Sequence, residues 1–153
     1  MTPIGDILRP EHVNLSLAAT DKPGAVEEVL SRLNGDPRVV DFAFFRAAVM
    51  GRDAAAISEG GCGICIAHGR TESVSGLILA AGRSVAGFRC PEVKEPVHFV
   101  FVAGIPAAFN SEYLRTVGAI ARICRDKHQI ERLLAAKTVE HFMDLLGAGE
   151  VKL

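Results

Sequence analysis

The sequence predicts a three-layer α/β/α domain with a central mixed β-sheet. Three stretches in the middle of the chain are almost continuously apolar, as strands covered on both faces are: 64–68, 74–81 and 98–104. Stretches with apolar residues at helical spacing lie before and after them. At 153 residues the chain has the length of one ordinary domain, so we expect a single domain over residues 1–153.

The N-terminal third predicts a helical turn, a strand and a first long helix. Residues 4–8 form the expected turn, which Pro10 closes, and residues 12–17 alternate apolar and polar side chains as a half-buried strand does. Asp21 is the expected N-cap of the helix. Asn34-Gly35 is expected to end it.

A second helix is expected over residues 39–53, with apolar side chains at helical spacing. Its predicted buried residues are Val39, Phe42, Ala43, Phe45 and Val49. Gly51 is expected to close the helix, which puts Arg52 just beyond its end. Residues 58–63 are expected to form a flexible loop, because three of the six are glycines.

The last third of the chain predicts three helices, over 114–124, 128–136 and 139–146. Thr138 is the expected N-cap of the last one. Three of the five histidines, His12, His128 and His141, are expected at surface positions of helices or loops.

Composition and charge argue against several classes of function. The formal net charge is −1, with 17 Lys and Arg against 18 Asp and Glu, so no nucleic-acid partner is expected. No apolar run reaches about 18 residues, so no membrane span is expected. The first residues do not resemble a signal peptide, and we expect a cytoplasmic protein whose four cysteines are reduced thiols.

His68 lies where a predicted strand ends and Gly69 follows. Side chains alternate along a strand, so Ile64, Ile66 and His68 share one face, with His68 at the carboxyl end where α/β sheets bind ligands. One ring nitrogen could meet a reacting group while the other is held by an acceptor, as in a nucleophilic imidazole. From this pattern alone, a core histidine satisfied by a carbonyl group is the commoner outcome.

Cys62, Cys65 and His68 also have the spacing of a metal or thiol redox site. Metal ligands must converge, however, and on a strand Cys65 points away from His68. Cys90 and Cys124 stand alone, so no second pair completes four ligands. This is the weakest of the alternatives, and no metal or cofactor is expected.

Residues 49–70, VMGRDAAAISEGGCGICIAHGR, place an arginine beside an acidic residue and, sixteen positions later, the histidine at the strand end. In order and spacing they resemble the type-2 IIA domains of the bacterial phosphoenolpyruvate-dependent phosphotransferase system. This family includes the fructose- and mannitol-type IIA domains and the nitrogen-regulatory IIA proteins. The resemblance extends over residues 6–30, 95–106 and 111–126, and so covers nearly the whole chain.

The resemblance implies an α/β/α fold and a phosphoryl-carrier function. It implies that His68 accepts a phosphoryl group from a small histidine phosphocarrier protein, with Arg52 as the phosphate partner. An arginine fork suits the equatorial oxygens of a transferring phosphoryl group. Further candidate phosphate contacts are Ser58, Gly61, Gly63 and Tyr113.

The implied recipient is a IIB protein or a regulatory target. Nothing in these residues resembles a IIB or IIC domain, which favours a regulatory role of the nitrogen type over sugar carriage. The chain is then a phosphotransferase component, and an enzyme only in the sense that it forms a phosphohistidine intermediate.

Three departures from the family pattern define an alternative function. Glu59 adds a negative charge near the expected phosphate, Ala67 replaces the proline before the histidine, and Tyr113 replaces a second histidine. A nearby carboxylate disfavours a phosphate, and a tyrosine can donate a hydrogen bond but cannot serve as an imidazole. The alternative is a divergent regulatory binding protein that keeps the fold without the chemistry.

Overall fold

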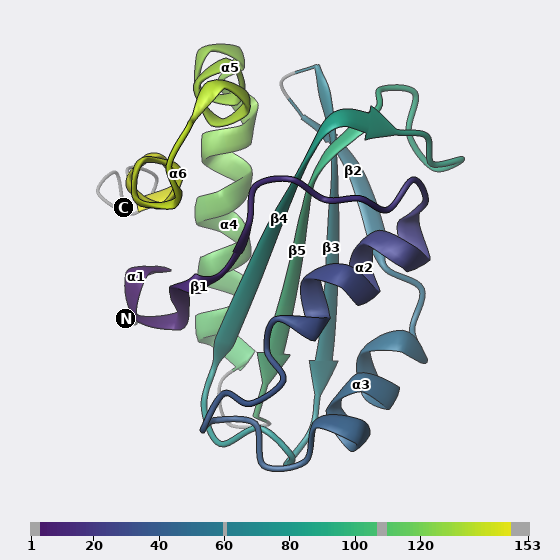
Figure 1. Ribbon diagram of the computed structural model, residues 1–153, viewed down its shortest axis with the longest axis vertical. Helices are drawn as coiled ribbons and strands as arrows, with labels where there is room; N and C mark the ends of the chain where they lie inside the picture. Colours follow the sequence, from purple (N-terminus) through teal and green to yellow (C-terminus); the bar gives the residue numbers. More distant parts are fainter. Residues whose placement is uncertain (1–3, 60, 107–109, 148–153) are drawn as a thin grey trace.

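The computed structural model describes residues 4–59, 61–106 and 110–147, and its strands form one mixed sheet (Figure 1). The strands are β1 (Leu8–Asn14), β2 (Ala55–Glu59), β3 (Cys62–Arg70), β4 (Ile78–Phe88) and β5 (Val97–Ile105). They lie in the order β1-β4-β5-β3-β2. β1 pairs parallel with β4 and β3 parallel with β5, whereas β4–β5 and β2–β3 are antiparallel. The predicted α/β class with a mixed sheet is confirmed.

Helices cover both faces of this sheet (Figure 1). The helices are α1 (Ile4–Ile7), α2 (Lys22–Ser31), α3 (Phe42–Met50), α4 (Asn110–Arg125), α5 (Lys127–Ala135) and α6 (Val139–Gly147). One apolar core lies beneath α2 and α3 and contains Cys65, Ala67 and Val100 of the strands. The other lies beneath α4, α5 and α6 and contains Ile64, Phe99 and Phe101. Burial on both faces explains why these strands have near-continuous apolar sequences.

The predicted caps define where the helices begin. Asp21 accepts a hydrogen bond from Gly24 N at 2.8 Å, and Thr138 Oγ1 accepts one from His141 N at 3.1 Å. α3 begins only after Asp41, which accepts from Phe44 N at 3.1 Å. Because the helix starts three residues later than predicted, its fully buried row is Phe45 and Val49 alone. Of the other predicted core residues, Val39 and Phe42 are half-buried and Ala43 is exposed.

The predicted loop over residues 58–63 is wrong. Residues 55–59 form β2, and Glu59 pairs with Cys62, so the two strands make a tight hairpin. Gly61 has a φ of 79°, a backbone conformation that favours glycine. The sequence of β2, AAISE, lacks a longer apolar or alternating run that would predict a strand. The strand forms because β3 supplies its hydrogen-bonding partners.

The N-terminal strand also starts earlier than predicted, at Leu8 rather than residue 12. It contains Pro10, which an edge strand tolerates, and its register with β4 shifts between Leu8 and Val13. His12 is therefore a buried strand residue, 5% exposed, rather than the expected surface histidine. His128 and His141 are exposed as predicted.

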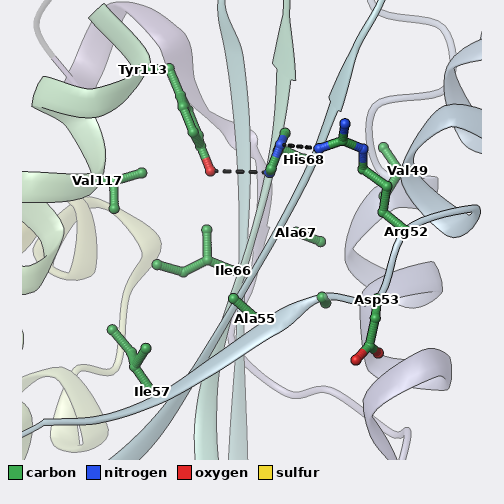
Figure 2. A pocket seen from close by; sticks show the side chains of 11 residues that line it. Val49, Arg52, Asp53, Ala55, Ile57, Ile66, Ala67, His68, Tyr113 and Val117 are labelled. Carbon is green, nitrogen blue, oxygen red and sulfur yellow. Dashed lines mark hydrogen bonds between the residues drawn. The ribbon is translucent and has the colours of Figure 1, made fainter. Parts of the chain in front are cut away.

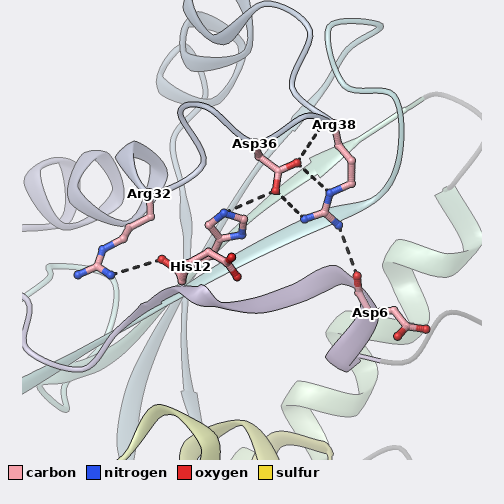
Figure 3. Close-up of polar contacts among 6 residues, drawn as sticks. Asp6, His12, Arg32, Asp36 and Arg38 are labelled. Carbon is pink, nitrogen blue, oxygen red and sulfur yellow. Dashed lines mark hydrogen bonds and ion pairs between the residues drawn. The ribbon is translucent and has the colours of Figure 1, made fainter.

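His12 belongs to a polar network that joins β1 to the loop between α2 and α3 (Figure 3). Its Nε2 atom lies 3.5 Å from Asp36 Oδ2, and Arg38 donates to both oxygens of Asp36 at 3.0 and 2.9 Å. The hydrogen bonds from Arg38 lower the pKa of Asp36 to about 2, and burial lowers the pKa of His12. Both groups bind protons more readily in the unfolded chain than in the folded one. The free energy of unfolding therefore decreases as the pH falls through their pKa values.

Arg83 fastens the last helices to the sheet. This residue of β4 is 7% exposed, and its guanidinium donates to the carbonyl oxygens of Leu133 at 2.9 Å, Leu134 at 3.2 Å and Ala136 at 2.7 Å. A fourth hydrogen bond reaches Leu15 O at 3.1 Å. The C-terminal carbonyl groups of α5 have no partners within their own helix, so a buried cation here satisfies them and complements the helix dipole.

We expect Arg83→Met to lower the free energy of unfolding by roughly 2–4 kcal/mol, because it keeps the apolar stem of the side chain but leaves several buried carbonyl groups unpaired. Urea denaturation at pH 7 measures this change. Arg89→Met is the matched control, since Arg89 is exposed and donates to a single carbonyl group among the described residues, Lys94 O at 2.6 Å. A loss below about 1 kcal/mol for Arg83→Met would show that water replaces these contacts.

Candidate phosphoryl-transfer site

β3 presents His68 at the rim of the sheet. Cys62 and Ile64 are buried on the face beneath α4, and Ile66 and His68 continue that row half-buried. Ala67 faces the opposite core, as alternation predicts. The strand runs on to Arg70, two residues further than predicted, and His68 pairs with Ala103 of the parallel strand β5. The histidine is therefore fixed by pairing on its carboxyl side as well as its amino side.

Gly69 allows α3 to approach β3 closely. A Cβ atom at this position would lie 2.9 Å from Val49 Cγ2 and 3.3 Å from Val49 N. The helix therefore packs directly on the strand, and its end at Gly51 stands beside His68. Gly69 thus has a packing role: the close approach of α3 brings Arg52, the residue after Gly51, to the site.

Two side chains hold the imidazole from opposite sides (Figure 2). Arg52 Nη1 lies 3.0 Å from His68 Nε2, and the Tyr113 hydroxyl lies 3.3 Å from His68 Nδ1. A guanidinium can only donate, so Nε2 of the neutral ring must be the acceptor. The proton then resides on Nδ1 and is donated to the tyrosine oxygen. This tautomer leaves the nucleophilic lone pair on Nε2, facing the cation.

The surroundings keep this imidazole neutral. Burial lowers the pKa of His68, and the positive charges of Arg52 and Arg70 lower it further. Burial raises the pKa of Tyr113, so its hydroxyl stays protonated at pH 7. A neutral imidazole whose Nε2 carries a lone pair rather than a proton is the form needed for nucleophilic attack.

The histidine opens into a cavity of about 490 Å³ between α3, α4 and the hairpin of β2 and β3. Much of its lining is apolar and includes Ala55, Ile57, Ile66 and Val117 (Figure 2). Tyr113 and Val117 are four residues apart and so share one face of α4. Local sequence patterns do not predict the places of Ala55, Ile57 and Val117 in this lining, because only the fold brings β2 and α4 together over β3.

Ser58, Gly61 and Gly63 lie elsewhere. Ser58 pairs with Gly63 at the amino end of β3, five residues and roughly 16 Å from His68. The Ser58 hydroxyl donates to Glu95 Oε1 instead. Gly63 leaves room for the backbone that precedes β5, since a Cβ atom there would lie 3.0 Å from Glu95 O. The side chain of Glu59 lies outside the described residues, so its relation to the site stays a prediction.

The described residues offer no metal site. No three of their His, Cys, Asp and Glu side chains gather so as to hold a metal ion. Cys62 and Cys65 belong to different cores, on opposite faces of the sheet. All four cysteines are buried, and none of them forms a disulfide. Across the same part of the chain, no helix has both the length and the apolar character that crossing a bilayer would need.

NMR titration of the His68 ring is expected to give a pKa below 6.5, because burial and two arginines disfavour the protonated form. Arg52→Gln is expected to raise this pKa without restoring it fully, since burial remains. Arg132→Gln, an exposed change on α5, is the control and should leave it unchanged. A wild-type value of 6.5 or above would contradict the neutral tautomer derived from these contacts.

Comparison with known proteins gives a consistent family. The family described as "Phosphoenolpyruvate-dependent sugar phosphotransferase system, EIIA 2" matches residues 6–148. A fructose-specific EIIA component from Haloferax volcanii is 29% identical over 148 residues, 96% of each chain. A nitrogen regulatory protein from Bradyrhizobium diazoefficiens is 24% identical over 148 residues, 95% of each. A fructose-specific EIIABC component from Bacillus subtilis is 22% identical over 94% of this chain, which spans only 23% of that protein.

Known structures share the fold. The nitrogen regulatory protein IIA-Ntr from Neisseria meningitidis superposes with a TM-score of 0.79 at 24% identity, covering 94% of this chain and 98% of that one. The mannitol IIA enzyme of Escherichia coli, in a complex with phosphorylated IIB, gives 0.73 at 19% identity, covering 90% and 95%. With a family match that spans almost the whole sequence, this chain belongs to the type-2 EIIA family of the phosphoenolpyruvate-dependent sugar phosphotransferase system.

Proposed function

We propose that this chain is a phosphoryl-accepting IIA component whose Nε2 atom of His68 takes the phosphoryl group. The observation that carries the proposal is the contact of 3.0 Å between Nε2 and Arg52, which supports Nε2 as the nucleophile, with a cation beside it. Family membership supports the reaction class. The donor in this proposal is the phosphohistidine of a small carrier protein.

The transfer needs no external base. The Nε2 lone pair of His68 attacks the phosphorus, a new N–P bond forms, and the N–P bond to the donor imidazole breaks. The electron pair of the broken bond returns to the donor ring. His68 keeps its proton on Nδ1, hydrogen-bonded to Tyr113, so the product carries a phosphoryl group on one nitrogen and a proton on the other.

Arg52 and Tyr113 have different tasks in this mechanism. The guanidinium occupies the position next to Nε2, where it can turn from the ring to the equatorial oxygens as negative charge arrives. Tyr113 orients the ring through its hydroxyl group. A tyrosine is sufficient for this task, so its presence in place of a second imidazole does not by itself remove the chemistry.

The apolar cavity supports a protein donor rather than a free phosphorylated metabolite. A small, highly charged substrate would leave the apolar lining exposed to water. A carrier protein, in contrast, can bury this lining against an apolar surface around its own histidine. The role implies contact with carrier proteins in the cytoplasm. We propose a regulatory target of the nitrogen-regulatory kind as recipient, with a IIB protein as the alternative; relatives of both kinds support these two possibilities.

Incubation with phosphoenolpyruvate and the two general phosphotransferase proteins is expected to add one acid-labile phosphoryl group to the wild-type chain. His68→Ala should take up none, because it lacks the nucleophile. Intact-mass measurement at neutral and acidic pH reads out the result. Uptake should slow as the pH falls through the lowered pKa of His68, since protonation removes the lone pair.

His141→Ala is the matched control, because this exposed histidine of α6 is absent from the cavity and should not affect uptake. A wild-type chain that stays unmodified beside a donor of demonstrated activity would reject the phosphoryl carrier in favour of the regulatory binding protein. Reverting Glu59 to glycine would then be the next experiment. Transfer from the modified chain to a fructose-type IIB protein would identify sugar carriage instead of regulation.

A further inference from the structure

Arg52 lies in a short connecting segment that borders a cavity. Residues 51–54 join the end of α3 to the start of β2 and border a second cavity of about 240 Å³. The backbone bonds that begin the segment are short-range, from Gly51 N to Ala47 O and from Arg52 N to Val49 O. The position of the guanidinium therefore depends on whatever holds the far end of the segment.

Lys22 holds that end. Its ammonium group donates to Ala54 O at 2.8 Å, lies 2.9 Å from Asp53 Oδ1 and contacts Glu92 Oε1. An ammonium has three hydrogens, so these three acceptors use all of them. Glu92 is itself held by the Cys90 thiol, which donates to its second oxygen at 2.7 Å. The lysine thus ties the segment to α2 and to the turn after β4.

The placement of this lysine runs against local preference. Lys22 is the first residue of α2, where a positive charge opposes the helix dipole. Only 11% of its side chain is exposed. Burial opposes its charge, but the hydrogen bonds to Glu92 and Asp53 outweigh burial and raise the pKa of Lys22. A residue that breaks a local rule usually has a compensating role in the tertiary structure.

Lys22 also forms an ion pair with Asp53, the residue next to Arg52 in the chain. Asp53 points away from His68 while Arg52 points toward it (Figure 2). An unpaired Asp53, 84% exposed, could fold back onto the neighbouring guanidinium and compete with a phosphoryl group for it. Its ion pair with Lys22 holds it on the far side of the segment.

We propose that Lys22 is a positioning residue for the reaction at His68: it anchors residues 53–54 and sequesters Asp53, so that Arg52 faces the histidine. This inference deepens the proposed function and rests on it for its kinetic consequence. Its structural consequence, the position of Arg52 beside the ring, can be measured without any phosphoryl transfer.

The decisive variant is Lys22→Met, which keeps most of the unbranched apolar stem and removes the ammonium group with its three N–H donors. We expect phosphoryl uptake to slow roughly 10- to 100-fold, the cost of a displacement of about 1 Å at a reacting centre. We also expect the pKa of His68, measured by NMR, to rise in the unphosphorylated protein. A cation that leaves the ring no longer disfavours the charged form. A merely structural role would leave this titration unchanged.

Two comparisons separate positioning from general damage. In an Arg52→Gln background, Lys22→Met should slow uptake by much less than it does alone, because both changes remove the same interaction. Lys22→Arg keeps a cation with several donors and should recover most of the rate. Lys137→Met, at an exposed lysine between α5 and α6, should match the wild type. If Lys22→Met fails to fold, Lys22→Gln replaces it, with a smaller change of the same sign expected.

The outcomes are distinct. A folded Lys22→Met variant with unchanged uptake and an unchanged His68 titration would overturn the proposal, as would effects that simply add to those of Arg52→Gln. If the wild-type chain takes up no phosphoryl group at all, the proposed function fails, but the titration still decides the role of Lys22. A raised pKa then supports the positioning role, and an unchanged pKa rejects it.

Discussion

The alternation of side chains along β3 is the constraint on which the site depends. β3 is paired on both edges and covered on both faces, so its residues cannot rotate without exposing apolar groups or losing ladder hydrogen bonds. Ile64 anchors the row beneath α4, and Ala67 anchors the opposite face beneath α3. His68 follows as the residue of the first row that reaches the rim. A slip of one residue would send the imidazole to the other side of the sheet.

Among the described residues, the two side chains that hydrogen-bond to the imidazole are delivered by helices packed against the sheet. Gly69 permits the close approach of α3, and the end of that helix delivers Arg52. On the other face α4 delivers Tyr113. The two nitrogens of the ring are thereby distinguished by two partners of different chemistry, a donor-only guanidinium and a hydroxyl that can accept. Selection of one tautomer is a consequence of the three-layer architecture, because the helices that deliver the two partners cover opposite faces of the sheet.

Departures from the family pattern acquire different weights in the structure. Ala67 is buried in the core beneath α2 and α3 and pairs with Val102 of β5, and this pairing continues to Arg70, so a rigid proline is not needed to hold the histidine. Tyr113 replaces an imidazole but keeps a hydrogen bond to the ring. Gly61 shapes the hairpin, and Gly63 lets the start of β3 pack against residues 95–96, far from Nε2 of His68. The family pattern thus combines two kinds of position. Some belong to the candidate site, and others fix the path of the backbone that leads to it.

The sequence by itself determined the class of fold, the N-caps at Asp21 and Thr138 and the pair of Arg52 and His68, because these follow from local periodicity, capping chemistry and a motif of fixed spacing. Tertiary structure alone decided what those rules do not encode. The edge strand β2 forms because β3 offers it partners, and His12 is buried because β1 adds to the sheet beside β4. Ser58 and Gly63 belong to the far end of the strand because a hairpin reverses the chain there. Lys22, thirty residues before Arg52, meets its segment only when α2 packs beside α3, since contacts between distant residues depend on the assembled layers and not on any local pattern.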